Sequence, residues 1–313
     1  MDKSIYLQVE HLCKQFRTPG GSVRAVDDVS FVIHRGETLG LVGESGSGKT
    51  TLGRTLLRLI NPDSGRILCC GTDITKANMK PWRKKMQIIF QNPSGSLDPK
   101  LKVRDIIAEG LTAGGFRGSR QEITREVGKL LCSVGLNEGD MDRYPDAFSG
   151  GQQQRIGIAR ALAVEPEFIV CDEPVSSLDV SYQSQIVNLL EDLKQQRQLT
   201  YLFISHDLSV VMHICDRVGV MYRGKLVELG SREDIVLRTA HPYTQDLLSA
   251  VPIPDPIRSR SRTHKPLPED GITTPAGGCP YLNRCPKADA QCACEAPALR
   301  EISEGHFSCC IKA

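Results

Sequence analysis

The sequence has no long apolar run and no strong excess of charge of either sign. No stretch approaches the roughly 18 consecutive apolar residues that a membrane-spanning helix needs. The first residues lack the apolar core of a signal peptide. Lys and Arg number 39 against 37 Asp and Glu, a net charge of +2, which gives no reason to expect nucleic acid as the main partner. We therefore expect a soluble, cytosolic protein that can still dock onto something in a membrane.

Internal repeats and low-complexity tracts are also absent, while cysteine is plentiful. The 313 residues, 40% of them hydrophobic, suffice for one large domain with an appendage or for two domains. Of the 12 cysteines, half are scattered before residue 250, where they fit buried small hydrophobic positions. The other half crowd into residues 279–310. In a reducing compartment such density suggests a metal site before it suggests disulfides.

One Gly-rich stretch fits the phosphate-loop pattern G-x-x-x-x-G-K-[ST]. It lies between a predicted buried strand at residues 38–42 and a predicted helix at residues 51–60. Its glycines let successive N–H groups converge on an anion at the positive end of the helix dipole. Lys49 would reach the β- and γ-phosphates and Thr50 would hold Mg²⁺. The alternative is a Gly/Ser-rich turn that matches by chance. The predicted phosphate-binding residues are Gly43, Ser45, Gly46, Gly48, Lys49, Thr50 and Thr51.

Polar side chains follow three predicted buried strands. Asp172 and Glu173 end the apolar run 168–171, at the carboxyl edge where α/β proteins place their sites. Asp172 can hold Mg²⁺ through water, and Glu173 is placed to act as a general base on an attacking water. Gln91 follows the strand 86–90, and His206 follows the strand 200–204, where it could contact a γ-phosphate. Solvated surface residues are the alternative for Gln91 and for the Asp172–Glu173 pair.

A second Gly-rich turn, at residues 148–152, leads into a predicted helix with Ser149 as its N-cap. Two anion sites a hundred residues apart in one chain are unusual, and a simple capped turn does not explain the pair of glycines. Phe16, in the first arm of a predicted hairpin at residues 4–33, is either ordinary sheet packing or an aromatic plate for a base.

With these motifs in place, residues 5–250 resemble the ATP-binding cassette family. Gln91 matches the Q-loop, 148–152 the signature turn with Phe in place of Leu, 177–179 the D-loop, His206 the switch histidine, and Phe16 the aromatic A-loop. The resemblance implies an α/β fold, a RecA-like phosphate-loop core with an antiparallel β-subdomain. It also implies a helical subdomain at about residues 92–165, within an ATPase domain at 1–250. Residues 251–313 would form a Pro-rich linker and a Cys-rich C-terminal domain.

The resemblance also implies a head-to-tail dimer, with each ATP held between one subunit's phosphate loop and the other's signature turn. Glu173, His206 and Gln91 would then be catalytic, and Thr50, Gln91 and Asp172 would hold Mg²⁺. The remaining predicted nucleotide contacts are Phe16, Ser149, Gly150, Gly151, Gln152 and Asp179. A membrane-embedded partner would convert the opening and closing of the dimer into transport.

Residues 241–244 and the cysteine segment resemble ATPase subunits of oligopeptide and dipeptide importers, a group that includes nickel importers. We expect peptide uptake, with nickel as the alternative cargo. The expected partners are a second, different ATPase subunit, two permeases and, indirectly, an extracytoplasmic binding protein, at the cytoplasmic face of the inner membrane. A soluble cassette protein of DNA repair or translation is disfavoured by the single cassette and the lack of a basic tail. A redox or iron sensor is disfavoured by the intact Glu173 and His206.

Cys279, Cys285 and Cys292 keep the group's C-x5-C-x6-C spacing, and Cys310 fits the last position. Related segments are similar to [4Fe-4S]-binding ones, so the resemblance implies an iron–sulfur cluster on these four residues. Thiolates suit zinc as well, and absence of metal is the third possibility. Cys294 and Cys309 are additional thiols that leave the ligand set open.

Overall fold

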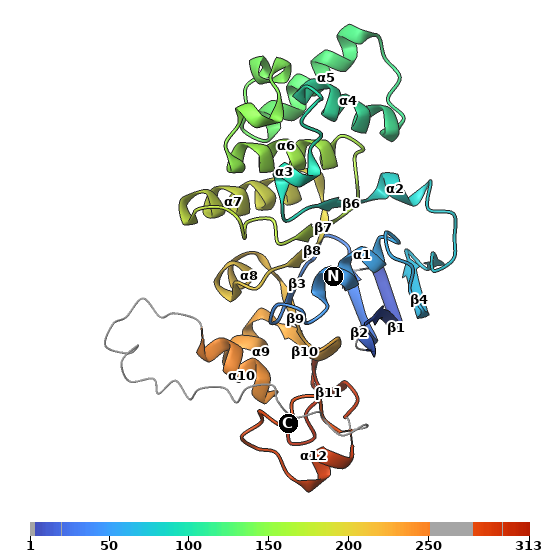
Figure 1. Ribbon diagram of the computed structural model, residues 1–313, viewed down its shortest axis with the longest axis vertical. Helices are drawn as coiled ribbons and strands as arrows, with labels where there is room; N and C mark the ends of the chain where they lie inside the picture. Colours follow the sequence, from blue (N-terminus) through green and yellow to red (C-terminus); the bar gives the residue numbers. More distant parts are fainter. Residues whose placement is uncertain (1–3, 20, 251–277, 296) are drawn as a thin grey trace.

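A computed structural model describes residues 4–19, 21–250, 278–295 and 297–313. An eight-stranded sheet runs through it in the order β11-β12-β10-β9-β3-β8-β7-β6 (Figure 1). Its strands are β3 (Thr38–Val42), β6 (Met86–Ile89), β7 (Phe168–Asp172), β8 (Thr200–Ile204), β9 (Arg217–Tyr222), β10 (Lys225–Ser231), β11 (Arg300–Ser303) and β12 (His306–Ser308).

The parallel centre of this sheet is apolar and closed to solvent. Every residue of β3, β7 and β8 is buried, because helices or a second sheet cover both faces. The register pairs Leu41 and Asp172 with the same residue, Ile204. The carboxyl ends of these strands therefore lie level, and whatever follows them in sequence meets at one edge.

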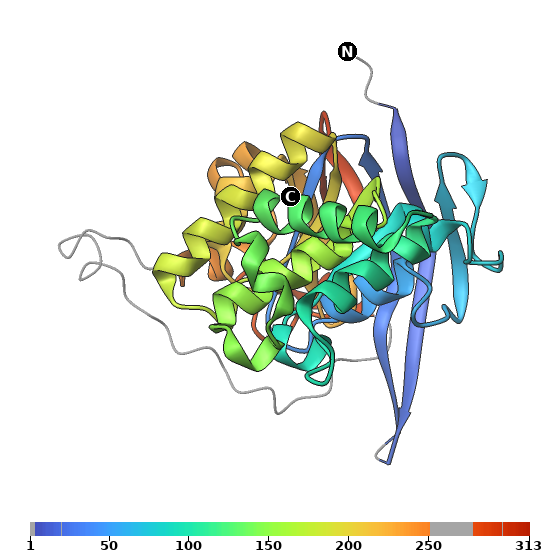
Figure 2. The same cartoon turned by 90° about the horizontal axis from the view of Figure 1, so that it is seen from above.

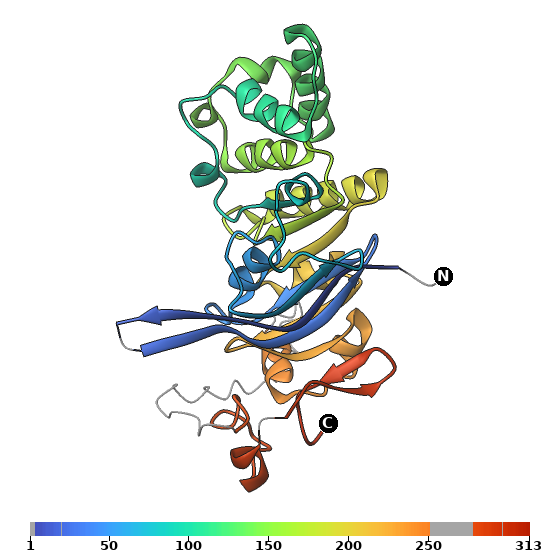
Figure 3. The ribbon, with the colours of Figure 1, turned by 90° about the vertical axis from the view of Figure 1, so that its right-hand side faces the viewer.

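A second sheet, ordered β2-β1-β4-β5, packs against this core. The hairpin of β1 (Ile5–Thr18) and β2 (Gly21–His34) carries it, joined by β4 (Ser64–Cys69) and β5 (Thr72–Asp73). Figure 3 shows the hairpin crossing the middle of the molecule, between the helical region (green) and the C-terminal segment (red). The predicted hairpin at residues 4–33 and the predicted antiparallel β-subdomain are confirmed.

A helical region follows β6 and precedes β7 in the sequence. Figure 2, the view from above, shows it to one side of the hairpin. It contains α3 (Pro93–Ser96), α4 (Val103–Gly114), α5 (Arg120–Ser133), the 3-10 turns Glu138–Asp142 and Pro145–Ala147, and α6 (Gly150–Leu162). The other helices are α1 (Lys49–Leu56), α2 (Trp82–Lys85), α7 (Val180–Arg197), α8 (Leu208–Ile214), α9 (Arg232–Leu237), α10 (Pro242–Ser249) and α12 (Ala290–Cys294).

Helix α1 is shorter than the helix predicted at residues 51–60. It ends at Leu56, and Arg58 adopts a left-handed φ of 53°, held by a hydrogen bond from its guanidinium to the Ile74 carbonyl. Leu52 and Leu56, on the predicted apolar face, are buried against the second sheet. Within the described ranges no helix combines the length and apolar character that crossing a membrane requires.

The C-terminal segment joins the main sheet. Strand β12 pairs antiparallel with β10, Ser308 opposite Glu228 and Phe307 opposite Leu229. Nε2 of His306 lies 2.9 Å from Oε1 of Glu228, and both side chains are buried. Most of the predicted Pro-rich linker, residues 251–277, lies outside the described residues. The predicted domain boundaries stay predictions.

Candidate nucleotide site

The phosphate loop curls between the end of β3 and the start of α1, and two of its glycines cannot be replaced without a clash. Gly43 and Gly48 adopt φ values of 150° and 104°. A Cβ on Gly43 would run into the carbonyl oxygen of Met221, and one on Gly48 into that of Ala25. The loop is thus wedged between β2 and β9, and only glycine fits at these two positions.

Lys49 projects into the curl of this loop. Its Nζ donates hydrogen bonds to the carbonyls of Gly43 (2.7 Å) and Glu44 (2.9 Å). Burial lowers the pKa of Lys49, while the nearby charges of Glu173 and Asp172 oppose that effect. A desolvated ammonium among converging loop N–H groups is a cradle for phosphate oxygens, so the residues present fit ATP.

Asp172 lies next to the loop and is buried. Its Oδ1 accepts a hydrogen bond from the Thr50 hydroxyl (2.7 Å), and Arg54 approaches its Oδ2 at 3.5 Å. Burial raises the pKa of Asp172 above its usual range. A hydroxyl and a carboxylate side by side are hard oxygen donors of the kind that Mg²⁺ takes beside a nucleotide, so these residues fit the ion.

Glu173 occupies a strained position just after β7. Its φ is 48°, a left-handed value that is uncommon outside glycine, and its N–H donates to the Ile204 carbonyl at 3.0 Å. Nε2 of Gln91 donates to Oε2 of Glu173 at 2.9 Å, and Nδ1 of His206 lies 3.2 Å from the same oxygen. Gln91 and His206, which follow two other strands of the sheet, therefore converge on the carboxylate of Glu173.

Lys49, Glu173, Gln91 and His206 line one cavity of about 510 Å³, whereas Asp172 is buried beside it behind Thr50. The sequence did not single out Val23 and Ala25 of β2, since small apolar residues in a strand carry no chemical signal. It also missed Arg54, which lies one helical turn after Thr50 and contacts Asp172. The cavity is lined by Val23, Ala25, Ser45, Gly46, Gly48, Lys49, Thr50, Thr51, Gln91, Glu173 and His206.

The signature turn and the D-loop do not line this cavity. Ser149 caps α6 in a reciprocal capping box with Gln152. A Cβ on Gly150 would lie 3.6 Å from the Leu178 side chain, and one on Gly151 would lie 2.9 Å from the Tyr182 ring. The signature turn therefore borders the segment that contains Asp179, which is the N-cap residue of α7. Their role at a second subunit's nucleotide stays a prediction.

Phe16 also lies outside the residues that line the cavity. It pairs with Val23 in the β1–β2 hairpin and is 39% exposed, with Lys14 Nζ 5.4 Å from its ring centroid. Because its strand neighbour Val23 does line the cavity, Phe16 lies close to it. The stacking of Phe16 on a base stays a prediction.

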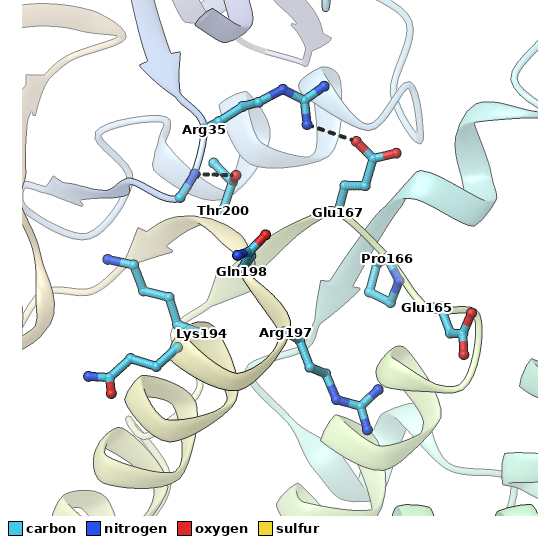
Figure 4. Close-up of a pocket in the computed structure, with 10 residues that line it drawn as sticks. Arg35, Glu165, Pro166, Glu167, Lys194, Arg197, Gln198 and Thr200 are labelled. Atoms are coloured by element: carbon cyan, nitrogen blue, oxygen red, sulfur yellow. Dashed lines mark hydrogen bonds and ion pairs between the residues drawn. The ribbon is translucent and has the colours of Figure 1, made fainter. Parts of the chain in front are cut away.

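A larger cavity of about 800 Å³ lies at the opposite, amino-terminal edge of the parallel strands (Figure 4). Two of its lining cations are paired: Arg35 with Glu167 at 3.1 Å, and Lys194 with Asp216 at 2.9 Å. Because sites in parallel sheets form at the carboxyl edge, the smaller cavity around Lys49 is the candidate nucleotide site.

The four cysteines predicted to bind a cluster lie near one another. The Cys279 N–H donates to the Cys292 carbonyl at 2.8 Å. Burial raises the pKa of the Cys279 and Cys285 thiols, and the charges of Cys292 and Cys310 add to this effect. Yet in the part of the chain that the structure describes, no three Cys, His, Asp or Glu residues form a group that could hold a metal ion. The donor chemistry suits a cluster, but the thiols are not arranged as a ready-made site.

Cys309 and Cys294, the additional thiols, differ from these four in their surroundings. The Cys309 Sγ donates to the Leu226 carbonyl at 3.2 Å, and burial raises its pKa to about 12. Cys294 is exposed.

The fold and the site together define an ATP-binding cassette. A dimeric structure of the cassette MJ0796, in a post-hydrolysis state bound to ADP and Pi, superimposes with a TM-score of 0.66 at 27% identity, covering 72% of this chain and 98% of that one. The cassette cbiO1 of Clostridium perfringens, part of the transporter complex cbiONQ, has the same TM-score at 28% identity, covering 74% of this chain and 91% of that one.

Sequence comparison gives the narrower family. The ABC transporter pattern matches residues 26–176, and the pattern of the oligopeptide/dipeptide transporter C-terminal region matches residues 227–292. The oligopeptide transport ATP-binding protein OppF of Bacillus subtilis is 47% identical over 98% of this chain and 96% of its own length. OppF of Haemophilus influenzae is 45% identical over 99% and 98%. The chain belongs to the ATP-hydrolysing subunits of oligopeptide/dipeptide ABC transporters.

Proposed function

We propose that this chain drives import of di- and oligopeptides by binding and hydrolysing ATP in a head-to-tail dimer. The observation that carries the proposal is the convergence of Gln91 and His206 on Glu173 inside the cavity that contains Lys49. The relatives named as oligopeptide transport proteins support the cargo.

In the proposed mechanism the loop N–H groups and Lys49 bind and orient the phosphates. Thr50 and Asp172 would hold Mg²⁺, with Gln91 as a further ligand, and the ion would neutralise charge that develops on the phosphate oxygens. Glu173 accepts the proton of the attacking water at Oε2. Gln91 and His206 fix the position of that oxygen, so hydrolysis proceeds mainly by positioning and charge stabilisation.

The proposal includes a partner for the signature turn. Ser149, Gly150, Gly151, Gln152 and Asp179 would contact the nucleotide of a second ATPase subunit, while Phe16 stacks on the base in its own subunit. We propose a heterodimer, since the group commonly pairs two different subunits. It would be attached to two permeases at the cytoplasmic face of the inner membrane and served by an extracytoplasmic binding protein. Nucleic acid has no place in the mechanism.

Co-expression with the permeases and the partner subunit, followed by labelled tripeptide uptake and ATP turnover, tests the proposal. We expect Mg²⁺-dependent turnover coupled to tripeptide uptake. Nickel uptake without peptide uptake would assign the nickel-importer alternative. Turnover that neither permease nor cargo affects would contradict a transport role and favour a soluble cassette protein.

We further propose that residues 1–250 form the ATPase domain, with its helical subdomain at about 92–165, and that residues 251–313 are an extension holding a [4Fe-4S] cluster. The support is the set of four neighbouring thiols, Cys279, Cys285, Cys292 and Cys310. No step of ATP hydrolysis depends on this cluster. Anaerobic purification with iron, sulfide and zinc assays should give about four iron and four sulfide per chain. Zinc alone, or no metal, would overturn the proposal.

A further inference from the structure

An ion pair joins the cysteine segment, residues 279–310, to the phosphate loop. Nη2 of Arg284 lies 2.9 Å from Oε1 of Glu44, and its Nη1 lies 3.1 Å from Oε2. The Arg284 side chain is 7% exposed. Two parallel N–H···O bonds from a rigid guanidinium fix both the distance and the orientation of the carboxylate.

Glu44 is the residue after Gly43 and is held from other directions as well. Its backbone N–H donates to the Tyr243 hydroxyl of α10 at 2.9 Å. Its carbonyl oxygen accepts from Nζ of Lys49 at 2.9 Å. A shift of the Glu44 side chain would therefore move a backbone group that is bonded directly to the lysine in the phosphate cradle.

An aromatic cluster holds Arg284 in place. Tyr281 lies edge-on to Tyr222, with ring centroids 5.2 Å apart, and 5.4 Å from Tyr243. Its hydroxyl bonds to Asp246 of α10, and its carbonyl accepts the Arg284 N–H at 3.1 Å. Arg284 thus lies in a turn anchored by a buried tyrosine, so its guanidinium reaches Glu44 with little conformational freedom left to lose.

The charge of Glu44 reinforces this contact against the effect of burial. Burial opposes the charged form of Arg284, but the hydrogen bonds and charge of Glu44 raise its pKa overall. Loss of Glu44 would leave a largely buried guanidinium without its carboxylate, and loss of Arg284 would free the Glu44 turn.

We propose that Arg284 is a positioning residue for the phosphate loop, through which the cysteine segment sets the affinity of the ATP site. The inference rests on the proposed ATP site at residues 43–51. Arg284 does not touch the nucleotide; it holds Glu44, and Glu44 orients the backbone around Lys49. Because Cys279 and Cys285 border the turn that carries Arg284, the segment's position and the loop's geometry are linked.

A double-mutant cycle on the full chain tests the proposal, using Glu44→Gln, Arg284→Gln and both together. We expect Arg284→Gln to raise the Kd for ATP about tenfold and the KM similarly, with kcat little changed. Arg284→Lys should recover part of the affinity, because it restores the charge but not the bidentate geometry. In the Glu44→Gln background, Arg284→Gln should have almost no further effect.

The matched control is Arg300→Gln. Arg300 belongs to the same segment, but its Nη2 donates to the tail carbonyls of Cys310, Ile311 and Ala313 and not to the described residues of the phosphate loop. This variant should bind ATP as the wild type does. Thermal unfolding of each variant separates loss of affinity from loss of fold.

Two outcomes would overturn the inference: an unchanged ATP Kd in folded Arg284→Gln, or strictly additive effects in the cycle. Failure of the wild type itself to bind ATP would instead contradict the proposed function.

Discussion

The phosphate-loop region and the cysteine segment both have a sequence spacing that indicates a site, but they differ in how far the folded chain builds it. Around Lys49, backbone geometry and side-chain hydrogen bonds already assemble the cavity. In the cysteine segment the thiols are neighbours without forming a metal-holding group among the described residues. Tyr281 and Arg284, two side chains there that make specific contacts with the rest of the chain, are not cysteines.

The difference follows from what makes each site. A phosphate loop consists of backbone N–H groups and glycine conformations, so the chain forms it alone. A metal site consists of side chains that repel one another when ionised, and the metal itself supplies the energy that brings them together. Spacing therefore predicts geometry in the first case and only donor chemistry in the second.

We expect the largest effect of a substitution at the cavity around Lys49, which the folded chain already assembles. Glu173→Gln keeps the size of the side chain but removes the base, so ATP turnover should fall by about 10²–10⁴-fold while ATP binding persists and the dimer stays closed. An ATPase assay measures turnover, and size-exclusion chromatography in the presence of ATP detects the closed dimer that binding produces. The control is Glu165→Gln in the second cavity, which should turn over normally. Wild-type turnover in Glu173→Gln would show that Glu173 is not the general base.

Binding should depend most on Lys49. Lys49→Ala removes a desolvated ammonium that is bonded to the loop carbonyls, so the Kd for labelled ATP should rise about tenfold to a hundredfold. Equilibrium binding checks this. Lys312→Ala removes a tail lysine that pairs with Asp289 and should leave the Kd unchanged. Equal losses of ATP affinity in both variants would mean that the phosphate loop and the cysteine segment do not differ in how they contribute to ATP binding.

The attachment of the cysteine segment is expected to depend on His306. His306→Ala leaves the buried Glu228 with one donor fewer, so β12 should open more easily by about 1–3 kcal/mol. Hydrogen exchange of the β12 amides measures this opening. His213→Ala, at a side chain that is 62% exposed, is the control. Unchanged exchange in His306→Ala would show that strand pairing alone holds the segment.

Much of the fold was predictable because its signals are local. The strands around residues 40, 170 and 202 are short apolar runs, and the structure has strands there. Glu173, Gln91 and His206 were singled out because each follows a predicted buried strand. Their meeting at Glu173 Oε2 required the register.

What the sequence did not reveal depends on distant contacts. Glu44 occupies a wildcard position of the loop pattern, and its partner Arg284 lies 240 residues away. Strand β12 is only 3 residues long, too short for an alternation of apolar and polar residues that would predict its pairing with β10. Val23 and Ala25 line the cavity because the hairpin passes over the loop, which no local pattern encodes.

The smallest expected effect is on the melting temperature of the protein. At Asp172 it distinguishes a residue that stabilises the fold from one that serves ATP hydrolysis. The pKa of Asp172 is raised mainly by burial, with the charge of Glu173 adding to it. An acid whose pKa is raised on folding destabilises the protein once it is ionised, that is, at pH above the raised value. Asp172→Asn removes this penalty and keeps an acceptor for the Thr50 hydroxyl, so the ligand-free protein should melt at a slightly higher temperature at neutral pH.

The pH dependence of this difference in Tm serves as its control. As the pH falls through the raised pKa, wild-type Asp172 becomes neutral, so the difference in Tm between the two proteins should shrink toward zero. Mg²⁺-dependent ATP turnover of Asp172→Asn should be lost at every pH, because the amide does not replace a carboxylate ligand. Scanning calorimetry at neutral and mildly acidic pH measures the first effect. A variant that melts lower than the wild type at neutral pH would mean that Asp172 stabilises the fold, and that its burial serves structure more than the metal.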